Sequence, residues 1–149
     1  MKLCLVCSSG GHFLELHSLD TLWQAHDHFW VTFPGKDTEF FLGKRRVYWA
    51  YHPTNRSITN LIRNLFLAVK VIGKEKPDAV ISTGAGVAVP FLYVGRLFGA
   101  KTVYIESLTR VHTLSLSGRL VYPIVHAFLV QWPELADKHR KAVFEGQVI

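Results

Sequence analysis

Small and polar residues follow directly after two apolar runs of the sequence, where a parallel sheet would bind a ligand. The first group follows residues 3–7 and consists of Ser8, Ser9, Gly10, Gly11 and His12. Glycines let the backbone turn sharply and approach a ligand, and the N–H groups at the start of a following helix attract anions. We therefore predict that this segment binds a phosphate or diphosphate, with a tight turn that holds no ligand as the alternative. It is neither a G-x-G-x-x-G motif nor a P-loop.

His12 adds a titratable group to this segment. An imidazole exchanges protons near neutral pH, so His12 can act as a base, donate a hydrogen bond to an anion, or cap the helix. The second group follows the apolar run 78–82 and consists of Thr83, Gly84, Ala85 and Gly86. It should lie beside the first group, either as a second ligand-binding loop or as a second tight turn.

A third candidate group lies at the end of the apolar run 101–106. Burial of the Glu106 carboxylate is unfavourable unless it is paired or faces a cleft. Arg110 can form an ion pair with Glu106, or it can bind an acidic ligand through two hydrogen bonds. Ser107 lies between them as a further polar candidate.

No metal site is predicted. Cys4 and Cys7 have C-x2-C spacing, but residues three apart on a strand point to opposite faces, and no second pair is present. We expect two buried cysteines. Trp132, after the apolar run 127–131, is expected to pack in the core rather than to offer a flat surface to a sugar.

The elements that position these groups alternate between strands and helices, which predicts an α/β fold with a largely parallel sheet. Six strands are expected at residues 3–7, 29–33, 47–51, 78–82, 101–106 and 127–131. Helices are expected at residues 13–23, 58–72, 90–98, 118–125 and 133–143. Ligands of such sheets bind at the carboxyl ends of the strands, where the candidate groups lie.

Composition limits the class of protein. The 149 residues fit one domain, residues 1–149, and 49% hydrophobic with 19% charged residues exclude a disordered chain. No apolar run reaches the roughly 20 residues of a membrane span, and no secretory signal opens the sequence, so we expect a cytoplasmic location. The net charge of +6 favours an anionic partner. Nucleic acid is not expected, because no reader motif is present.

The predicted helix 58–72 is amphipathic, with Ser57 as its expected N-cap. Its apolar residues should pack on the sheet, with contact to lipid as the alternative; they are Ile58, Leu61, Ile62, Leu65, Phe66, Val69 and Ile72. A basic stripe accompanies them: Arg56, Arg63, Lys70 and Lys74. Such a stripe can bind an anionic membrane surface, or it can be a solvated face.

Five segments together resemble a known family. In chain order they are SSGGH (8–12), STGAG (82–86), YIESLTRV (104–111), QWPEL (131–135) and EGQ (145–147). They are similar to bacterial capsule and exopolysaccharide biosynthesis subunits, which are related to the membrane-recruiting subunit of the eukaryotic dolichol-diphosphate N-acetylglucosamine transferase. The resemblance implies a Rossmann-like three-layer sandwich, the N-terminal half of a GT-B glycosyltransferase.

The resemblance also implies an inverting transfer to a polyprenyl-diphosphate saccharide. A separate donor-binding subunit would hold the nucleotide sugar, so no cofactor or metal is expected on this chain. His12 is the first candidate for the base and Glu106 the second. The acceptor would contact Ser8, Ser9, Gly10, Gly11, Thr83, Gly84, Gly86, Ser107 and Arg110. Peripheral attachment to the inner face of the cytoplasmic membrane is expected, because the eukaryotic subunit's N-terminal anchor has no counterpart here.

Two other functions remain open. The chain could be a non-catalytic activator or anchor of a complete glycosyltransferase. It could also be a stand-alone Rossmann nucleotide-binding enzyme, but it lacks the glycine fingerprint and an acidic ribose ligand after the second strand, where Phe33-Pro34-Gly35 stands.

Overall fold

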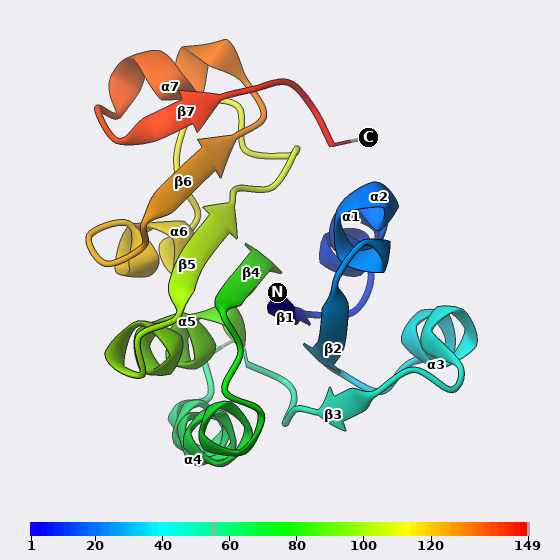
Figure 1. Cartoon of the computed structure of the whole chain (residues 1–149). Helices are drawn as coiled ribbons and strands as arrows, with labels where there is room; N and C mark the ends of the chain where they lie inside the picture. Colours follow the sequence, from blue (N-terminus) through cyan, green and yellow to red (C-terminus); the bar gives the residue numbers. More distant parts are fainter. Residues whose placement is uncertain (55, 149) are drawn as a thin grey trace.

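Parallel strands form one sheet between two layers of helices in the computed structural model, which describes residues 1–54 and 56–148 (Figure 1). Within these residues the sheet has seven strands in the order β3-β2-β1-β4-β5-β6-β7. The strands are β1 (Lys2–Cys7), β2 (Asp27–Thr32), β3 (Val47–Trp49), β4 (Ala79–Gly84), β5 (Lys101–Ile105), β6 (Ala127–Val130) and β7 (Ala142–Phe144). The helices are α1 (Gly11–His17), α2 (Asp20–Gln24), α3 (Lys36–Leu42), α4 (Ile58–Glu75), α5 (Ala88–Leu97), α6 (Leu116–Val121) and α7 (Pro133–Lys138). The predicted α/β class with a parallel sheet is confirmed.

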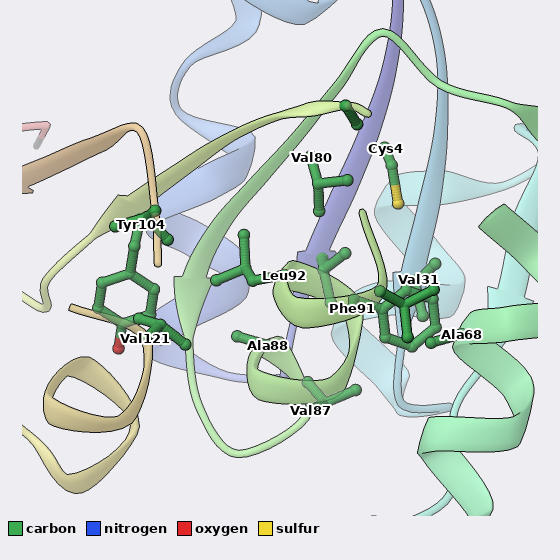
Figure 2. Packing of buried hydrophobic residues seen from close by; sticks show 14 of the residues in the cluster. Cys4, Val31, Ala68, Val80, Val87, Ala88, Phe91, Leu92, Tyr104 and Val121 are labelled. Carbon is green, nitrogen blue, oxygen red and sulfur yellow. The ribbon is translucent and has the colours of Figure 1, made fainter. Parts of the chain in front are cut away.

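Strand β1 lies inside the sheet, between β2 and β4, and separates two hydrophobic cores. Because successive side chains of a strand point to opposite faces, Cys4 and Val6 pack in one core, and Leu3 and Leu5 pack in the other. The first core is filled by α4, α5 and α6, and Figure 2 shows Phe91 and Leu92 of α5 in it. Helices α1 and α2 cover the second core.

The two cysteines occupy opposite faces, as the sequence predicts. Both are buried and neither is in a disulfide. Burial raises the pKa of Cys7 to about 12, so its thiol stays protonated at neutral pH. Within residues 1–54 and 56–148 no three His, Cys, Asp or Glu side chains are grouped so that they could hold a metal ion.

Several expected boundaries are wrong. The expected helix 13–23 is two short helices, α1 and α2, separated at Ser18 and Leu19. Helix α3 was not predicted, and the last helix ends at Lys138 instead of continuing to Val143. Residues 142–144 form a seventh strand that pairs with β6, because Val143 and Phe144 suit an extended chain better than a helix.

Candidate functional site

A cleft of about 650 Å³ opens at the carboxyl ends of β4 and β5, between the first turns of α4 and α6. Ligands bind at this end of open α/β sheets. The polar side chains of its lining include His12, Ser107, Thr109, Arg110, Ser115 and Ser117. The apolar side chains of its lining include Ile58, Leu61, Val89, Leu116 and Leu120. Thr54, Arg56, Ser57, Ala85, Gly86 and Tyr104 complete the lining.

His12 lies in the first turn of α1 and is fixed by two hydrogen bonds to Thr83 near the end of β4. Its Nδ1 lies 2.7 Å from the carbonyl oxygen of Thr83, and the Thr83 hydroxyl donates to the His12 carbonyl at 2.6 Å. A carbonyl oxygen only accepts, so Nδ1 carries the proton. The lone pair of the neutral ring is therefore on Nε2, and 30% of the side chain is exposed.

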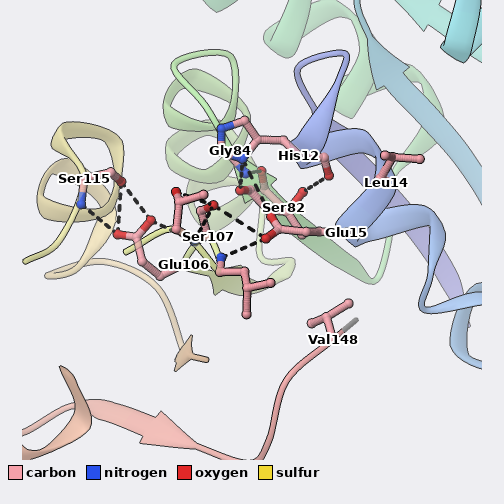
Figure 3. Close-up of polar contacts among 12 residues, drawn as sticks. His12, Leu14, Glu15, Ser82, Gly84, Glu106, Ser107, Ser115 and Val148 are labelled. Carbon is pink, nitrogen blue, oxygen red and sulfur yellow. Dashed lines mark hydrogen bonds and ion pairs between the residues drawn. The ribbon is translucent and has the colours of Figure 1, made fainter. Parts of the chain in front are cut away.

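Gly84 lets the His12 ring lie against the chain. Its φ is +113°, and a Cβ built on it would lie 3.0 Å from two atoms of the His12 ring (Figure 3). Gly86 is similarly close to Thr54, whose Oγ1 would lie 3.1 Å from an added Cβ. The second glycine segment thus packs closely against His12 and Thr54.

Glu106 lies beneath the cleft and is fully buried. Its carboxylate accepts hydrogen bonds from the Ser115 amide at 2.9 Å, the Ser115 hydroxyl at 2.9 Å and the Ser107 amide at 3.1 Å. Gly118 leaves room for it, because an added Cβ would collide with Glu106 Oε2. These donors compensate the burial of the charge, which here fixes the start of α6.

The alternative of a Glu106–Arg110 ion pair is wrong. Glu106 is satisfied by Ser107 and Ser115, and Arg110 instead lines the cleft with an exposed side chain. Among residues 1–54 and 56–148, neither Arg110 nor Arg56 forms an ion pair. Two cations therefore face the cleft. Burial, and next the Glu106 charge, raise the pKa of Tyr104, so the cleft-lining phenol stays neutral.

The segment Ser8–Gly11 is bonded to the protein's own groups. The amide of Gly10 donates to the Asp37 carboxylate of α3 at 2.8 Å, and the amide of Ser8 donates to the Gly84 carbonyl at 2.9 Å. His12 reaches the cleft lining, whereas Ser8, Ser9, Gly10 and Gly11 do not, and neither do Thr83, Gly84 and Glu106. Gly86, Ser107 and Arg110 do line the cleft.

Two further residues support the loop after β5 and were not predicted as parts of the site. Glu15 Oε1 accepts from the Leu108 amide at 2.7 Å, and the Trp132 ring nitrogen donates to the Leu108 carbonyl at 2.6 Å. Trp132 thus holds this loop, where core packing was expected. Glu15 could have been suspected, because it stands among Phe13 and Leu16 on the buried side of α1.

The expected packing of α4 is wrong. The residues that face the sheet are Asn64, Ala68, Val71, Ile72 and Glu75. Six of the seven apolar residues predicted for the core are exposed instead, and we call them the apolar face of α4: Ile58, Leu61, Ile62, Leu65, Phe66 and Val69. The basic stripe is exposed beside them, with Arg63 lying over the Tyr51 ring at 4.4 Å. The apolar face begins at the cleft, since Ile58 and Leu61 line both.

The described part of the chain contains no helix that is both long enough and apolar enough to span a bilayer. The N-cap of α4 is as predicted, with the Ser57 hydroxyl accepting from the Asn60 amide at 3.2 Å.

Solved structures define the class of fold. MurG of Acinetobacter baumannii superposes with a TM-score of 0.78 at 16% identity, over 100% of this chain and 46% of that chain. The UDP co-structure of MnaA from S. aureus gives 0.78 at 13% identity, over 99% and 45%. At such identities the likeness shows the fold, which is the Rossmann-like N-terminal domain of the GT-B architecture.

The sequence then identifies the family. Residues 41–148 match the family "Oligosaccharide biosynthesis protein Alg14 like", and the chain belongs to this family. The "UDP-N-acetylglucosamine transferase subunit ALG14" of Homo sapiens is 33% identical over 99 residues, which are 62% of this chain and 46% of the human protein. The protein of the same name from Mus musculus is 29% identical over 141 residues, or 91% of this chain and 64% of its own length. The chain spans about half the length of the curated relatives it matches.

Proposed function

We propose that this chain is the acceptor-binding, membrane-recruiting subunit of a two-component inverting glycosyltransferase. Its substrate would be a polyprenyl-diphosphate saccharide at the inner face of the cytoplasmic membrane. The observation that carries this proposal is the cleft itself. Its lining combines cations and hydroxyls with apolar side chains, and two of these, Ile58 and Leu61, belong to the apolar face of α4.

The polar and apolar residues of the lining suit the two ends of such an acceptor. The diphosphate would be bound by Arg56 and Arg110, which have no ionic partner among the described residues. Ser107 and Thr109 also line the cleft, and their hydroxyls can bond to phosphate or sugar oxygens. The first isoprene units would lie along the apolar residues of the lining, which adjoin the apolar face of α4.

The apolar face of α4 would enter the membrane interface. Phe66 and Ile58 are 71% and 74% exposed, which is unfavourable in water for large apolar side chains on one helix face. The exposed cations Arg63, Lys70 and Lys74 accompany them. An interfacial helix combines apolar residues with flanking cations in this way, because the leaflet is anionic at its surface.

His12 is proposed as the general base. Its Nε2 would take the proton of the acceptor hydroxyl while the oxygen attacks the anomeric carbon of the donor sugar. The bond to the leaving phosphate oxygen breaks with its electron pair, which departs on the nucleoside diphosphate. The tautomer fixed by the Thr83 carbonyl leaves Nε2 unprotonated, as this role requires. Glu106, buried under several donors, remains the second candidate.

A partner chain is proposed to bind the nucleotide sugar. The relatives are named as subunits of a transferase, which favours a donor half on a separate polypeptide. The relatives named as UDP-N-acetylglucosamine transferase subunits favour UDP-GlcNAc as the donor. A role in capsule or exopolysaccharide synthesis remains a prediction from the sequence.

Reconstitution tests the proposal. The chain is co-purified with its candidate partner, and transfer of radiolabelled sugar from UDP-GlcNAc to a short-chain polyprenyl-diphosphate saccharide is measured. We expect transfer from the pair, none from either chain alone, and at least a hundredfold loss in His12→Ala. Full activity of the partner alone would instead indicate an activator or anchor, and turnover by this chain alone would indicate a stand-alone enzyme. His139→Ala, on the loop before β7, is the matched control.

A further inference from the structure

Glu15 is a buried carboxylate that no step of the proposed reaction uses so far. It follows His12 by one turn of α1, and 6% of its side chain is exposed. Its Oε1 accepts from the backbone amide of Leu108 at 2.7 Å and from the side-chain amide of Gln131 at 3.3 Å. Its other oxygen, Oε2, is buried and has no hydrogen-bond partner among the described residues.

The unpartnered oxygen faces His12. Oε2 lies 3.9 Å from His12 Nδ1, beyond hydrogen-bond length but within the range of a strong charge interaction (Figure 3). A buried carboxylate oxygen without a donor is unfavourable unless something else compensates its charge. A neutral His12 ring offers Oε2 no opposite charge, whereas a ring with a second proton does.

We propose that Glu15 is a positioning residue that stabilises the protonated His12 formed during sugar transfer. The inference rests on the proposed role of His12 as base. When Nε2 takes the acceptor proton, the new positive charge spreads over the ring and lies beside Oε2. Thr83 fixes the orientation of the ring, and Glu15 stabilises its charge. Buried groups aimed at a charge that develops during the reaction lower its barrier.

The other charged and titratable groups around His12 act in different directions. Arg56 and Arg110 face the same cleft and disfavour a cationic ring. Tyr104 is buried and neutral, and the Glu106 charge is satisfied by Ser107 and Ser115. Among the described residues, the carboxylate paired with the ring is that of Glu15, whose Oε2 lies 3.9 Å from Nδ1. Neutralising it therefore shifts the balance against the protonated state.

The substitution Glu15→Gln separates charge from structure. The glutamine oxygen can still accept from the Leu108 amide, so the loop after β5 keeps its support. Histidine titration followed by NMR in the isolated chain is the first measurement. We expect the midpoint of His12 to move at least half a pH unit lower in Glu15→Gln than in the wild type, and not to move in the control Glu134→Gln on α7. An unchanged midpoint in a folded Glu15→Gln protein overturns the inference.

A measurement on the wild-type protein does not depend on the variant folding. The ¹³C signal of the Glu15 carboxyl group should change at the pH where His12 titrates, because the two charges interact. A Glu15 signal that ignores the titration of His12 overturns the inference as well.

Kinetics of the reconstituted pair of chains connect the interaction to the reaction. Glu15→Gln should lower kcat about tenfold to a hundredfold with KM for the acceptor within about twofold, and the acidic limb of the rate profile should move to lower pH. An unchanged kcat despite a shifted midpoint overturns the positioning role. Full activity of His12→Ala in the same assay would disprove the proposed base itself. This outcome is distinguishable, because the difference in the His12 midpoint between the wild type and Glu15→Gln would persist.

Discussion

The Asn64 side chain binds both backbone polar groups of Tyr51: its Oδ1 accepts from the Tyr51 amide at 2.9 Å, and its Nδ2 donates to the Tyr51 carbonyl at 3.0 Å. Asn64 is buried in the middle of the face of α4 that packs on the protein. This pair of bonds ties the helix to the chain just after β3. It explains why a polar residue, and not the apolar stripe, faces inward.

Replacing Asn64 by leucine should therefore destabilise the protein although the helix becomes more apolar. The two Tyr51 backbone groups lose their partners, which costs about 1–3 kcal/mol of the free energy of unfolding. Urea denaturation followed by circular dichroism measures this. The matched control is Thr59→Leu on the exposed side of the same helix, for which we expect a change within about 0.5 kcal/mol. Equal stability of the two variants would contradict the role given to Asn64.

The apolar face of α4 should drive membrane binding. The double variant Leu65→Ser with Phe66→Ser should bind vesicles of phosphatidylglycerol and phosphatidylcholine at least about tenfold more weakly, because it removes apolar surface from the interface. The control Phe40→Ser, at a residue of α3 that is also exposed, should bind as the wild type does. Sedimentation with sucrose-loaded vesicles gives the partition coefficients. If only the α3 variant bound more weakly, the membrane-binding surface would include α3 and not α4.

The basic stripe should contribute in a salt-dependent way. Each cation near an anionic leaflet is worth about 1 kcal/mol, so Lys70→Gln with Lys74→Gln should weaken vesicle binding by about thirtyfold at low salt. The difference should shrink at 0.5 M salt and on uncharged vesicles, because screening removes the attraction. A salt-independent loss would indicate that these lysines act through the fold.

Gly84 should be essential for the placement of His12. In Gly84→Ala the new Cβ would meet the His12 ring at 3.0 Å, at a φ of +113° that alanine rarely adopts. We expect sugar transfer by the reconstituted pair of chains to fall at least about tenfold, along with a loss of about 1–3 kcal/mol in stability. Gly99 has a φ of +88° with open space around it, so Gly99→Ala tests the effect of backbone strain without a steric contact. Transfer should survive in Gly99→Ala, and an equal loss in both variants would show that backbone strain is responsible.

His126 should make the fold less stable in mild acid. Partial burial lowers its pKa, and the nearby Arg96 and two lysines lower it further. The Thr102 amide donates to its Nδ1 at 3.0 Å, which requires a neutral ring, and the Arg96 guanidinium 2.6 Å from Nε2 disfavours a positive charge on the ring. The unfolded chain then binds more protons than the folded one, and the free energy of unfolding should fall as pH drops below about 6.5. Urea melts at pH 7.5, 6.5 and 5.5 should show a weaker pH dependence in His126→Gln, and an identical dependence would contradict this assignment.

Much of the sheet could be predicted because its strands are continuous apolar runs between turn residues. The run Leu3–Cys7 is buried on both faces, which removes any need for alternation and makes the strand easy to detect. Strand β7 could not be detected in the same way. Three residues next to a polar helix carry too little pattern, and the pairing with β6 decides their conformation.

The site was harder to predict than the sheet. The position of His12 at the ligand end follows from the strand before it, but its bond to Thr83 depends on a contact 71 residues apart in sequence. Periodicity also locates an apolar stripe on α4 without telling which side of the helix meets the protein. That choice depends on Asn64 and Glu75, polar residues whose partners come from β3 and its flanks.

The order of the strands sets a requirement on synthesis. Strand β1 pairs with β2 on one side and with β4 on the other, and its partners in β4 begin at Ala79. In a nascent chain β1 therefore has an open hydrogen-bonding edge until Ala79 and the residues after it have left the ribosome. Unpaired edges invite wrong partners, so chaperones or slow, ordered translation would be of most benefit to this protein before β4 emerges.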